Sequence, residues 1–207
     1  MRIGIGQLNA HVGAIADNVA AILGMIDEAQ AAGCDVVLFP ELAVPGYIPL
    51  DLLWRPGFVS ACENGVRTIA ERSGAMTVIV GSVAESPAEA PVNRSDPSST
   101  CDGAGTEIRN VAHILAGGRE IGRVEKIHLP TYDIYNEKRY FSPGEGVETF
   151  LLAGTRVGVN VCEDLWIDDG PTDLQASLGA KVIFNVSASP FYVGKQEIRR
   201  RLARRRA

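Results

Sequence analysis

The chain has 207 residues and a mass of 22.1 kDa, with 46% hydrophobic and 22% charged residues. This composition is that of a folded chain with a core of its own, and it excludes a disordered, collagen-like or coiled-coil protein. No uncharged apolar stretch approaches the roughly 18 residues that a membrane-spanning helix needs. The four cysteines (Cys34, Cys62, Cys101 and Cys162) contain no CxxC pair, so neither a metal site nor a disulfide framework is indicated.

The two ends of the sequence differ in charge and in what they predict. The N-terminus, MRIGIGQLNA, lacks a basic segment followed by a long apolar one, so we expect no secretory signal and a cytoplasmic location. Six of the last nine residues are arginines, and without them the net charge of −5 becomes −5 − 6 = −11. An acidic body argues against a nucleic-acid partner, and we expect no membrane partner. The final helical segment, KQEIRRRLARRR, has no stop signal, so we expect a C-terminally truncated domain.

The first part of the chain alternates apolar strand patterns with helical patterns. Strands are predicted at Met1–Leu8, Asp35–Phe39 and Met76–Val83, and helices at Ala14–Ala32 and Phe58–Ser73. Short links between them favour an α/β fold. The next stretch, Glu85–Thr106, is rich in proline and serine and poor in apolar residues, so it is interpreted as an irregular loop insertion.

Hairpins follow in the second part of the chain. Asn110–Ala116 and Arg119–Glu125 flank a Gly-Gly turn, and Glu148–Leu152 and Arg156–Val161 flank Ala-Gly-Thr. A helix is expected at Asp173–Gly179 and a buried strand at Lys181–Val186. Hairpins mixed with βα units predict mixed rather than purely parallel sheets.

Three reactive side chains follow predicted strands. Glu41, Lys126 and Cys162 each come directly or almost directly after one, and the carboxyl ends of strands are where α/β sheets bind ligands. Together they suit acyl chemistry, in which a carboxylate takes the thiol proton, the thiolate attacks a carbonyl and the ammonium stabilises the oxyanion. Each one alone is more often a solvated charge or an inert thiol, and it is their conjunction that favours a site.

Five local sequences carry a resemblance to a known family: FPELAVPGY, EKIHLP, EKRYFSPG, GVNVCEDLW and NVSASPF. In order and spacing they resemble the nitrilase, or carbon–nitrogen hydrolase, superfamily. The resemblance implies a four-layer α–β–β–α sandwich, incomplete here at the C-terminus. It also implies that Glu41 is the general base, Lys126 the oxyanion-stabilising lysine, Cys162 the nucleophile and Glu137 a second, supporting glutamate.

Longer segments, ELAVPGYIPLDLL, LPTYDIYNEKRYFSPG and SASPFYVGK, resemble the glutamine-hydrolysing domain of glutamine-dependent NAD synthetases. This implies hydrolysis of glutamine to glutamate and ammonia, with ammonia passing to a synthetase domain. ATP and magnesium would belong to that absent domain, and no cofactor or metal is expected in this chain. The resemblance places Tyr132, Tyr135, Glu163 and Ser189 in the glutamine pocket, and it implies a homo-oligomer.

Two alternatives stay open. The chain could be a stand-alone hydrolase of another small amide or carbamoyl compound, or an inactive truncated remnant. We also expect Trp54 and Trp166 to form walls of the site and His128 to pack near the lysine. The acidic run from Glu163 to Asp173 either holds a cation or, more commonly for such a run, begins a helix.

Overall fold

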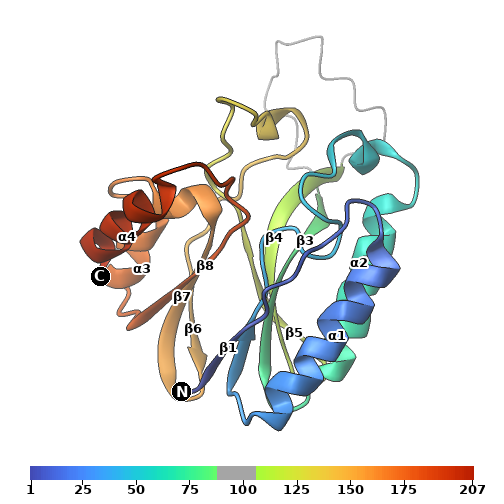
Figure 1. Ribbon diagram of the computed structural model, residues 1–207, viewed down its shortest axis with the longest axis horizontal. Coiled ribbons are helices and arrows are strands. Elements are labelled where there is room, and N and C mark those ends of the chain that lie inside the picture. The colour runs from blue at the N-terminus through green and yellow to red at the C-terminus, as the bar shows by residue number, and fades with distance from the viewer. Residues whose placement is uncertain (88–105) are drawn as a thin grey trace.

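The computed structural model describes residues 1–87 and 106–207. Two β-sheets face each other, and helices cover the outer side of each, which gives four layers in the order α–β–β–α (Figure 1). This is the architecture that the resemblance implied. Within the described residues, no helix is both long and apolar enough to cross a membrane.

The first sheet contains five strands in chain order: β1 (Ile3–Ile5), β2 (Val36–Leu38), β3 (Thr77–Pro87), β4 (Thr106–Ala116) and β5 (Arg119–Glu125). β1, β2 and β3 are parallel, whereas β4 and β5 pair antiparallel. The helices α1 (Ile15–Ala31) and α2 (Phe58–Arg72) pack side by side on its outer face (Figure 1).

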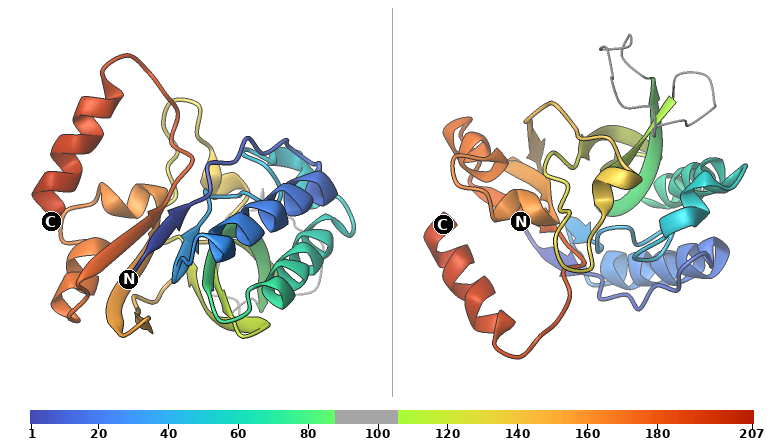
Figure 2. Two further views of the ribbon diagram at one scale, coloured as in Figure 1. Left: turned by 60° about the horizontal axis from the view of Figure 1, so that its bottom comes forward. Right: turned by 90° about the horizontal axis from the view of Figure 1, so that it is seen from above.

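The second sheet has the order β6 (Thr149–Leu152), β7 (Thr155–Val161) and β8 (Val182–Val186). β6 and β7 form an antiparallel hairpin, and β7 and β8 are parallel. The helices α3 (Pro171–Ser177) and α4 (Lys195–Arg206) lie on the outer side of this sheet (Figure 2). Both sheets are therefore mixed, as the hairpin signals predicted.

Two apolar cores hold the layers together. One fills the space between the sheets, where Val36, Ile79 and Ile114 of the first sheet belong to the same cluster as Val159 and Phe184 of the second. The other joins the first sheet to α1 and α2. Side chains that alternate along a strand point to opposite faces, so β2, β3 and β4 contribute to both cores.

The helix, strand and hairpin predictions are confirmed in type, with corrections at several boundaries. β1 spans only three of the eight residues expected, and α3 begins two residues earlier than predicted. The insertion expected at 85–106 is wrong at both edges, because β3 continues to Pro87 and β4 begins at Thr106. The antiparallel pairing of the two strands sustains polar residues there that carry no strand pattern on their own. The remainder of that insertion lies outside the described residues.

Three short 3₁₀ helices were not predicted: η1 (Leu50–Trp54), η2 (Glu137–Arg139) and η3 (Cys162–Leu165). Segments of three to five residues are too short to show helical periodicity in a sequence. Two of them carry residues of the candidate site, since η2 begins with Glu137 and η3 begins with Cys162.

Candidate active site

Glu41 lies in the turn after β2, and its carboxylate is almost completely buried, with 1% of the residue exposed. The turn is tight, and Leu42 adopts a left-handed conformation with a φ of 51°. Three groups donate hydrogen bonds to this carboxylate. Lys126 Nζ and Asn110 Nδ2 lie 2.8 and 2.9 Å from Oε1, and the backbone N–H of Ala188 lies 3.1 Å from Oε2. The carboxylate is therefore held in a fixed orientation.

Lys126 follows β5 directly, and its ammonium group lies between two carboxylates. Nζ is 2.8 Å from Glu41 Oε1 and 2.7 Å from Glu137 Oε2, and all three side chains are buried. Burial by itself would lower the pKa of Lys126, but the neighbouring negative charges of Glu41 and Glu137 outweigh it and raise that pKa above its ordinary value. The lysine is thus a permanent cation, and one N–H toward each carboxylate leaves a third for another acceptor.

Glu137 is the first residue of η2, and it is as buried as Glu41. Burial raises the pKa of Glu137 to about 7, although the charge of Lys126 opposes this shift. The charge of Glu41 adds to the upward shift, because two carboxylates share one ammonium. The cluster accordingly contains two carboxyl groups and one ammonium, and the pKa of Glu137 is shifted toward neutrality.

Cys162 stands at the sharp junction between β7 and η3. Its φ of 45° lies in the left-handed region, which is uncommon for a residue other than glycine. Burial and the charge of Glu41 raise the pKa of the thiol to about 12, although Lys126 and a hydrogen bond with Ser187 act in the opposite direction. Nearness to an ammonium by itself favours the thiolate, but burial and the charge of Glu41 outweigh it. The resting group is a thiol, which needs a base to become a nucleophile.

A buried aspartate connects the nucleophile turn with the lysine segment. Asp164 Oδ1 accepts hydrogen bonds from the backbone N–H and the ring Nδ1 of His128, both at 2.9 Å. Its other oxygen accepts the backbone N–H of Val161 at 3.3 Å. Asp164 therefore fixes the end of β7 against the segment that follows Lys126. His128 lies two residues after Lys126 and anchors Asp164, and its packing near the lysine side chain stays a prediction.

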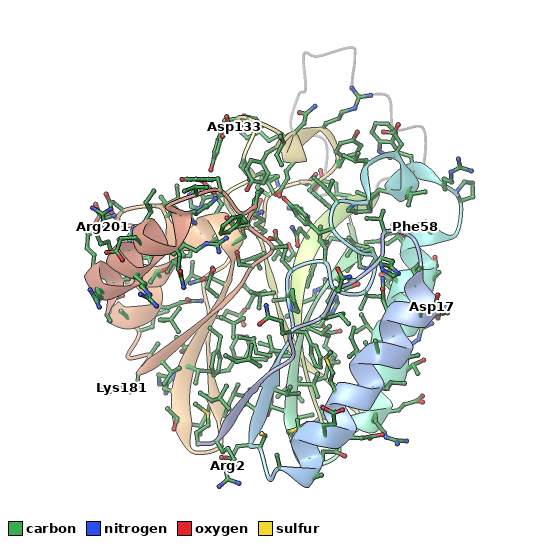
Figure 3. The ribbon with its side chains drawn as sticks, viewed as in Figure 1. Arg2, Asp17, Phe58, Asp133, Lys181 and Arg201 are labelled. Carbon is green, nitrogen blue, oxygen red and sulfur yellow. The ribbon has the colours of Figure 1, made fainter. Side chains whose placement is uncertain are left out.

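Glu163, the residue after Cys162, lines a pocket of about 510 Å³, a volume within the usual size range for small-molecule sites. Four of its lining residues are the ones that the resemblance placed in a substrate pocket: Tyr132, Tyr135, Glu163 and Ser189. Asp133, which also lines it, lies at the opposite end of the molecule from Arg2 and Lys181, where β1 and β8 begin (Figure 3). The pocket thus opens at the carboxyl ends of the parallel strands, as expected for an α/β sheet.

Opposite charges meet in this pocket. Tyr132 donates its hydroxyl to Glu163, at 2.9 and 3.0 Å from the two carboxylate oxygens. Burial and this hydrogen bond raise the pKa of Tyr132, so the hydroxyl remains a donor. The cation is Lys195, the first residue of α4, whose Nζ lies 5.0 Å from the ring centre of Tyr192 and 5.6 Å from that of Trp166. A carboxylate and an ammonium on one pocket suit a zwitterionic ligand.

α4 is fixed to the body of the protein by its far end. Leu202 is buried, and Arg206 lies 2.9 Å from Asp168 and 2.8 Å from Asp173. Arg205 adds an ion pair with Asp168 at 3.1 Å. The helix that carries Lys195 into the pocket is therefore held by an apolar contact and by ion pairs, and the Arg206 side chain of these pairs is largely buried.

Sequence reasoning missed Asn110, Asp164 and Lys195, and it misplaced one tryptophan. Lys195 stands inside a quoted motif, SASPFYVGK, and its charge could have singled it out. Trp166 lines the pocket as expected, but Trp54 does not: it packs against Tyr140, with ring centres 5.0 Å apart, and its ring is partly exposed. Among the residues with described positions, no group of three or more His, Cys, Asp or Glu could hold a metal ion.

An α–β–β–α sandwich with a buried thiol, carboxylate and ammonium at its strand ends points to the class of hydrolases that cleave carbon–nitrogen bonds. The carbon–nitrogen hydrolase family matches residues 2–207, and the chain belongs to this family of enzymes.

Its relatives include longer proteins. The chain is 36% identical to the glutamine-dependent NAD(+) synthetase of Xylella fastidiosa and 33% identical to that of Synechocystis. These alignments cover 100% and 97% of this chain but only 35% and 36% of the relatives, so the chain spans about a third of their length.

Solved structures agree with this placement. The glutamine-dependent NAD+ synthetase of Acinetobacter baumannii, solved with ADP, superposes with a TM-score of 0.82 at 27% identity over 95% of this chain and 34% of its own. An amidase from Nesterenkonia sp. superposes with a TM-score of 0.76 at 22% identity over the whole of this chain and 71% of its own. The second likeness shows that the same fold serves a protein that is not a synthetase.

Proposed function

We propose that this domain hydrolyses the side-chain amide of glutamine to glutamate and ammonia. The observation that carries the proposal is the pocket in which Glu163 and Lys195 supply opposite charges beside the Cys162 turn. Glutamine presents an α-ammonium and an α-carboxylate at one end and a neutral amide at the other. Glu163, with Tyr132, would bind the ammonium, and Lys195, with Ser189, would bind the carboxylate. The amide then points toward the thiol.

The reaction would begin with transfer of the Cys162 proton to Glu41. The Sγ electron pair forms a bond to the amide carbon, and the carbonyl electrons move onto oxygen. The third N–H of Lys126 and the backbone N–H of Glu163 would stabilise this oxyanion. Glu41 then gives the proton to the departing nitrogen, which leaves as ammonia, and a thioester remains. Water, deprotonated by Glu41, hydrolyses the thioester to glutamate and restores the thiol.

The role of Glu137 in this scheme is to keep Lys126 in place. Two carboxylates beside one lysine fix the position and the charge of its ammonium, which therefore does not pair with Glu41 alone.

We further propose that the ammonia serves a synthetase domain, because the relatives of which this chain spans a third are NAD(+) synthetases. ATP and magnesium would act in that other domain. The cytoplasmic location and the homo-oligomer expected from the sequence stay predictions.

The test is ammonia release from glutamine compared with asparagine, with small aliphatic amides and with carbamoyl compounds. We expect glutamine to have the highest kcat/KM. Glu163→Gln and Lys195→Met each remove one pocket charge and should raise KM for glutamine by about tenfold or more, the effect of losing a charged hydrogen bond or ion pair in a pocket. Neither change should alter the KM for a neutral aliphatic amide. A preference for small amides over glutamine would contradict the proposal and favour a stand-alone amidase.

A further inference from the structure

Asn110 is a buried residue of β4 that touches both the candidate base and the segment of the candidate oxyanion donor. Only 1% of it is exposed. Its side-chain Nδ2 lies 2.9 Å from Glu41 Oε1, and its backbone carbonyl accepts the N–H of Lys126 at 2.8 Å. One residue thus joins Glu41, which lies 69 positions earlier in the chain, to the start of the loop that carries Lys126.

The chemistry of the groups fixes which way the amide points. A carboxylate only accepts hydrogen bonds when it is ionised, so the nitrogen of Asn110 and not its oxygen must face Glu41. The amide oxygen, Oδ1, is buried and has no hydrogen-bond partner among the described residues. A buried acceptor left unpaired is unfavourable, and an apolar residue would avoid that cost. The amide N–H directed at Glu41 is what asparagine provides here and an apolar side chain would not.

The two oxygens of Glu41 are used differently. Oε1 accepts from Asn110 and from Lys126 Nζ, so both of its lone-pair directions are occupied. Oε2 accepts one backbone N–H, from Ala188, and keeps a second lone pair. Of the two oxygens, only Oε2 is free to take a proton from another group.

We propose that Asn110 is a positioning residue that holds the Glu41 carboxylate so that Oε2 receives the Cys162 proton. The inference rests on the proposed function, in which Glu41 is the base. The proton moves from Sγ to Oε2, and the sulfur electron pair forms the new bond to the electrophile, so no other reactant is needed. Without the amide N–H, the carboxylate can rotate about its last bond and the productive orientation is populated less often.

The experiment measures the rate at which chloroacetamide alkylates Cys162 in Asn110→Ala and Asn110→Ser, with peptide mapping to separate this site from the other cysteines. We expect the rate to fall by about tenfold or more, as for a misplaced general base. The final extent of labelling at Cys162 should stay at one label per chain, because the site remains folded. With glutamine, kcat should fall in parallel while KM changes by less than about twofold, since Asn110 does not line the pocket.

Two further variants make the outcomes distinct. Gln175→Ala removes another amide that is 1% exposed but that touches none of Glu41, Lys126 and Cys162, and it should leave the labelling rate unchanged. Glu41→Gln should slow labelling more than either Asn110 variant. If Glu41→Gln slows labelling and both Asn110 variants react at the wild-type rate, the inference is wrong and the proposed base stands. If Glu41→Gln does not slow labelling, the proposed function itself is wrong.

A double variant that exchanges the carboxylate of Glu41 and the amide of Asn110 tests the direct contact between the two side chains. Asn110→Asp places a second carboxylate against Glu41 and should lower the Tm, because two like charges are buried together. Adding Glu41→Gln restores one donor and one acceptor, so the double variant should regain most of the lost Tm while remaining inactive. A double variant no more stable than Asn110→Asp alone would contradict the direct contact.

Discussion

Gly81 lies directly against the turn that carries Glu41. A Cβ atom on Gly81 would come within 2.4 Å of the Pro40 carbonyl oxygen and 2.6 Å of the Glu41 Cα, closer than real Cβ contacts. The backbone of Gly81 also binds this turn on both sides, because its N–H donates to Pro40 and its carbonyl accepts from Val44. β3 thus supports the candidate base through a contact that needs a residue without a side chain.

Gly81→Ala should therefore displace Glu41. The obstructing atoms are backbone, so the turn itself must move, at a cost of about 1–3 kcal/mol of stability. A shift of the base by a fraction of an ångström should lower kcat by about tenfold or more. Measurement of kcat and of chemical denaturation tests both effects.

Gly24→Ala is the matched control for this substitution. Gly24 is an exposed position inside α1 where a Cβ would meet nothing within 4 Å. The same added methyl group should there stabilise the helix by about 0.5–1 kcal/mol and leave kcat unchanged. Equal behaviour of the two variants would contradict the role given to Gly81.

Cys162→Ala should abolish both amide hydrolysis and covalent labelling by a glutamine-like electrophile. Of the three cysteines in the described residues, only Cys162 stands beside a carboxylate and an ammonium. Cys62 is buried, and its burial raises the pKa of that thiol to about 12 with no cationic neighbour to oppose the shift. Alanine at Cys34, Cys62 or Cys101 should leave turnover intact. Labelling mapped by mass spectrometry to another cysteine would overturn the assignment of the nucleophile.

Glu137 should make the stability of the protein depend on pH near neutrality. Its pKa of about 7 in the folded state is higher than the ordinary value of 4.5, so the folded state binds this proton more tightly than the unfolded chain does. The resulting stabilisation is complete below pH 4.5 and is lost as the pH rises through 7. A shift of this size corresponds to at most about 3 kcal/mol.

Glu137→Gln removes this titration and serves to isolate it. The free energy of unfolding of the wild type minus that of Glu137→Gln should fall between about pH 5 and pH 8. Denaturation at a series of pH values measures the difference. A difference that stays constant over this interval would show that Glu137 keeps an ordinary pKa in the folded protein.

The strand-end rule explains why much of the candidate site could be predicted. Glu41 and Cys162 follow the buried strands β2 and β7, and Lys126 follows the largely exposed β5. An α/β sheet brings such strand ends together, as the structure shows for Glu41 and Lys126. Asn110 could not be found this way, because it lies inside a strand and its partner is far away in sequence. The one available signal was a polar residue facing the apolar space between the sheets. Nor could strand patterns locate β3 beyond Val83, where pairing with β4 and not composition maintains the strand.

Edge strands of both sheets leave apolar surface uncovered. Ile5 of β1 is 77% exposed, although it is on the same side of the sheet as Val36, which is buried between the sheets. β1 and β8 are edge strands, and exposed apolar side chains on an edge strand favour association between chains. Ile5→Lys should reduce light scattering on heating and change the free energy of unfolding by less than about 0.5 kcal/mol. Val36→Lys, on the same face of the sheet, is the control and should unfold the protein. Equal light scattering by the wild type and Ile5→Lys would show that the exposed edge does not drive association.

The attachment of α4 makes ionic strength a way to separate binding from chemistry. Lys195 reaches the pocket from a helix whose far end is held by the exposed pair of Arg205 with Asp168 and by the largely buried Arg206, which pairs with Asp168 and Asp173. At 1 M salt the screening length falls to about 3 Å, and the exposed pair of Arg205 with Asp168 weakens. The pair of Lys126 and Glu41 is out of contact with solvent and is screened far less. Added salt should therefore raise the KM for glutamine, while the rate at which a neutral reagent alkylates Cys162 stays constant. Electrolyte alone would then distinguish how the substrate is held from how it is cleaved.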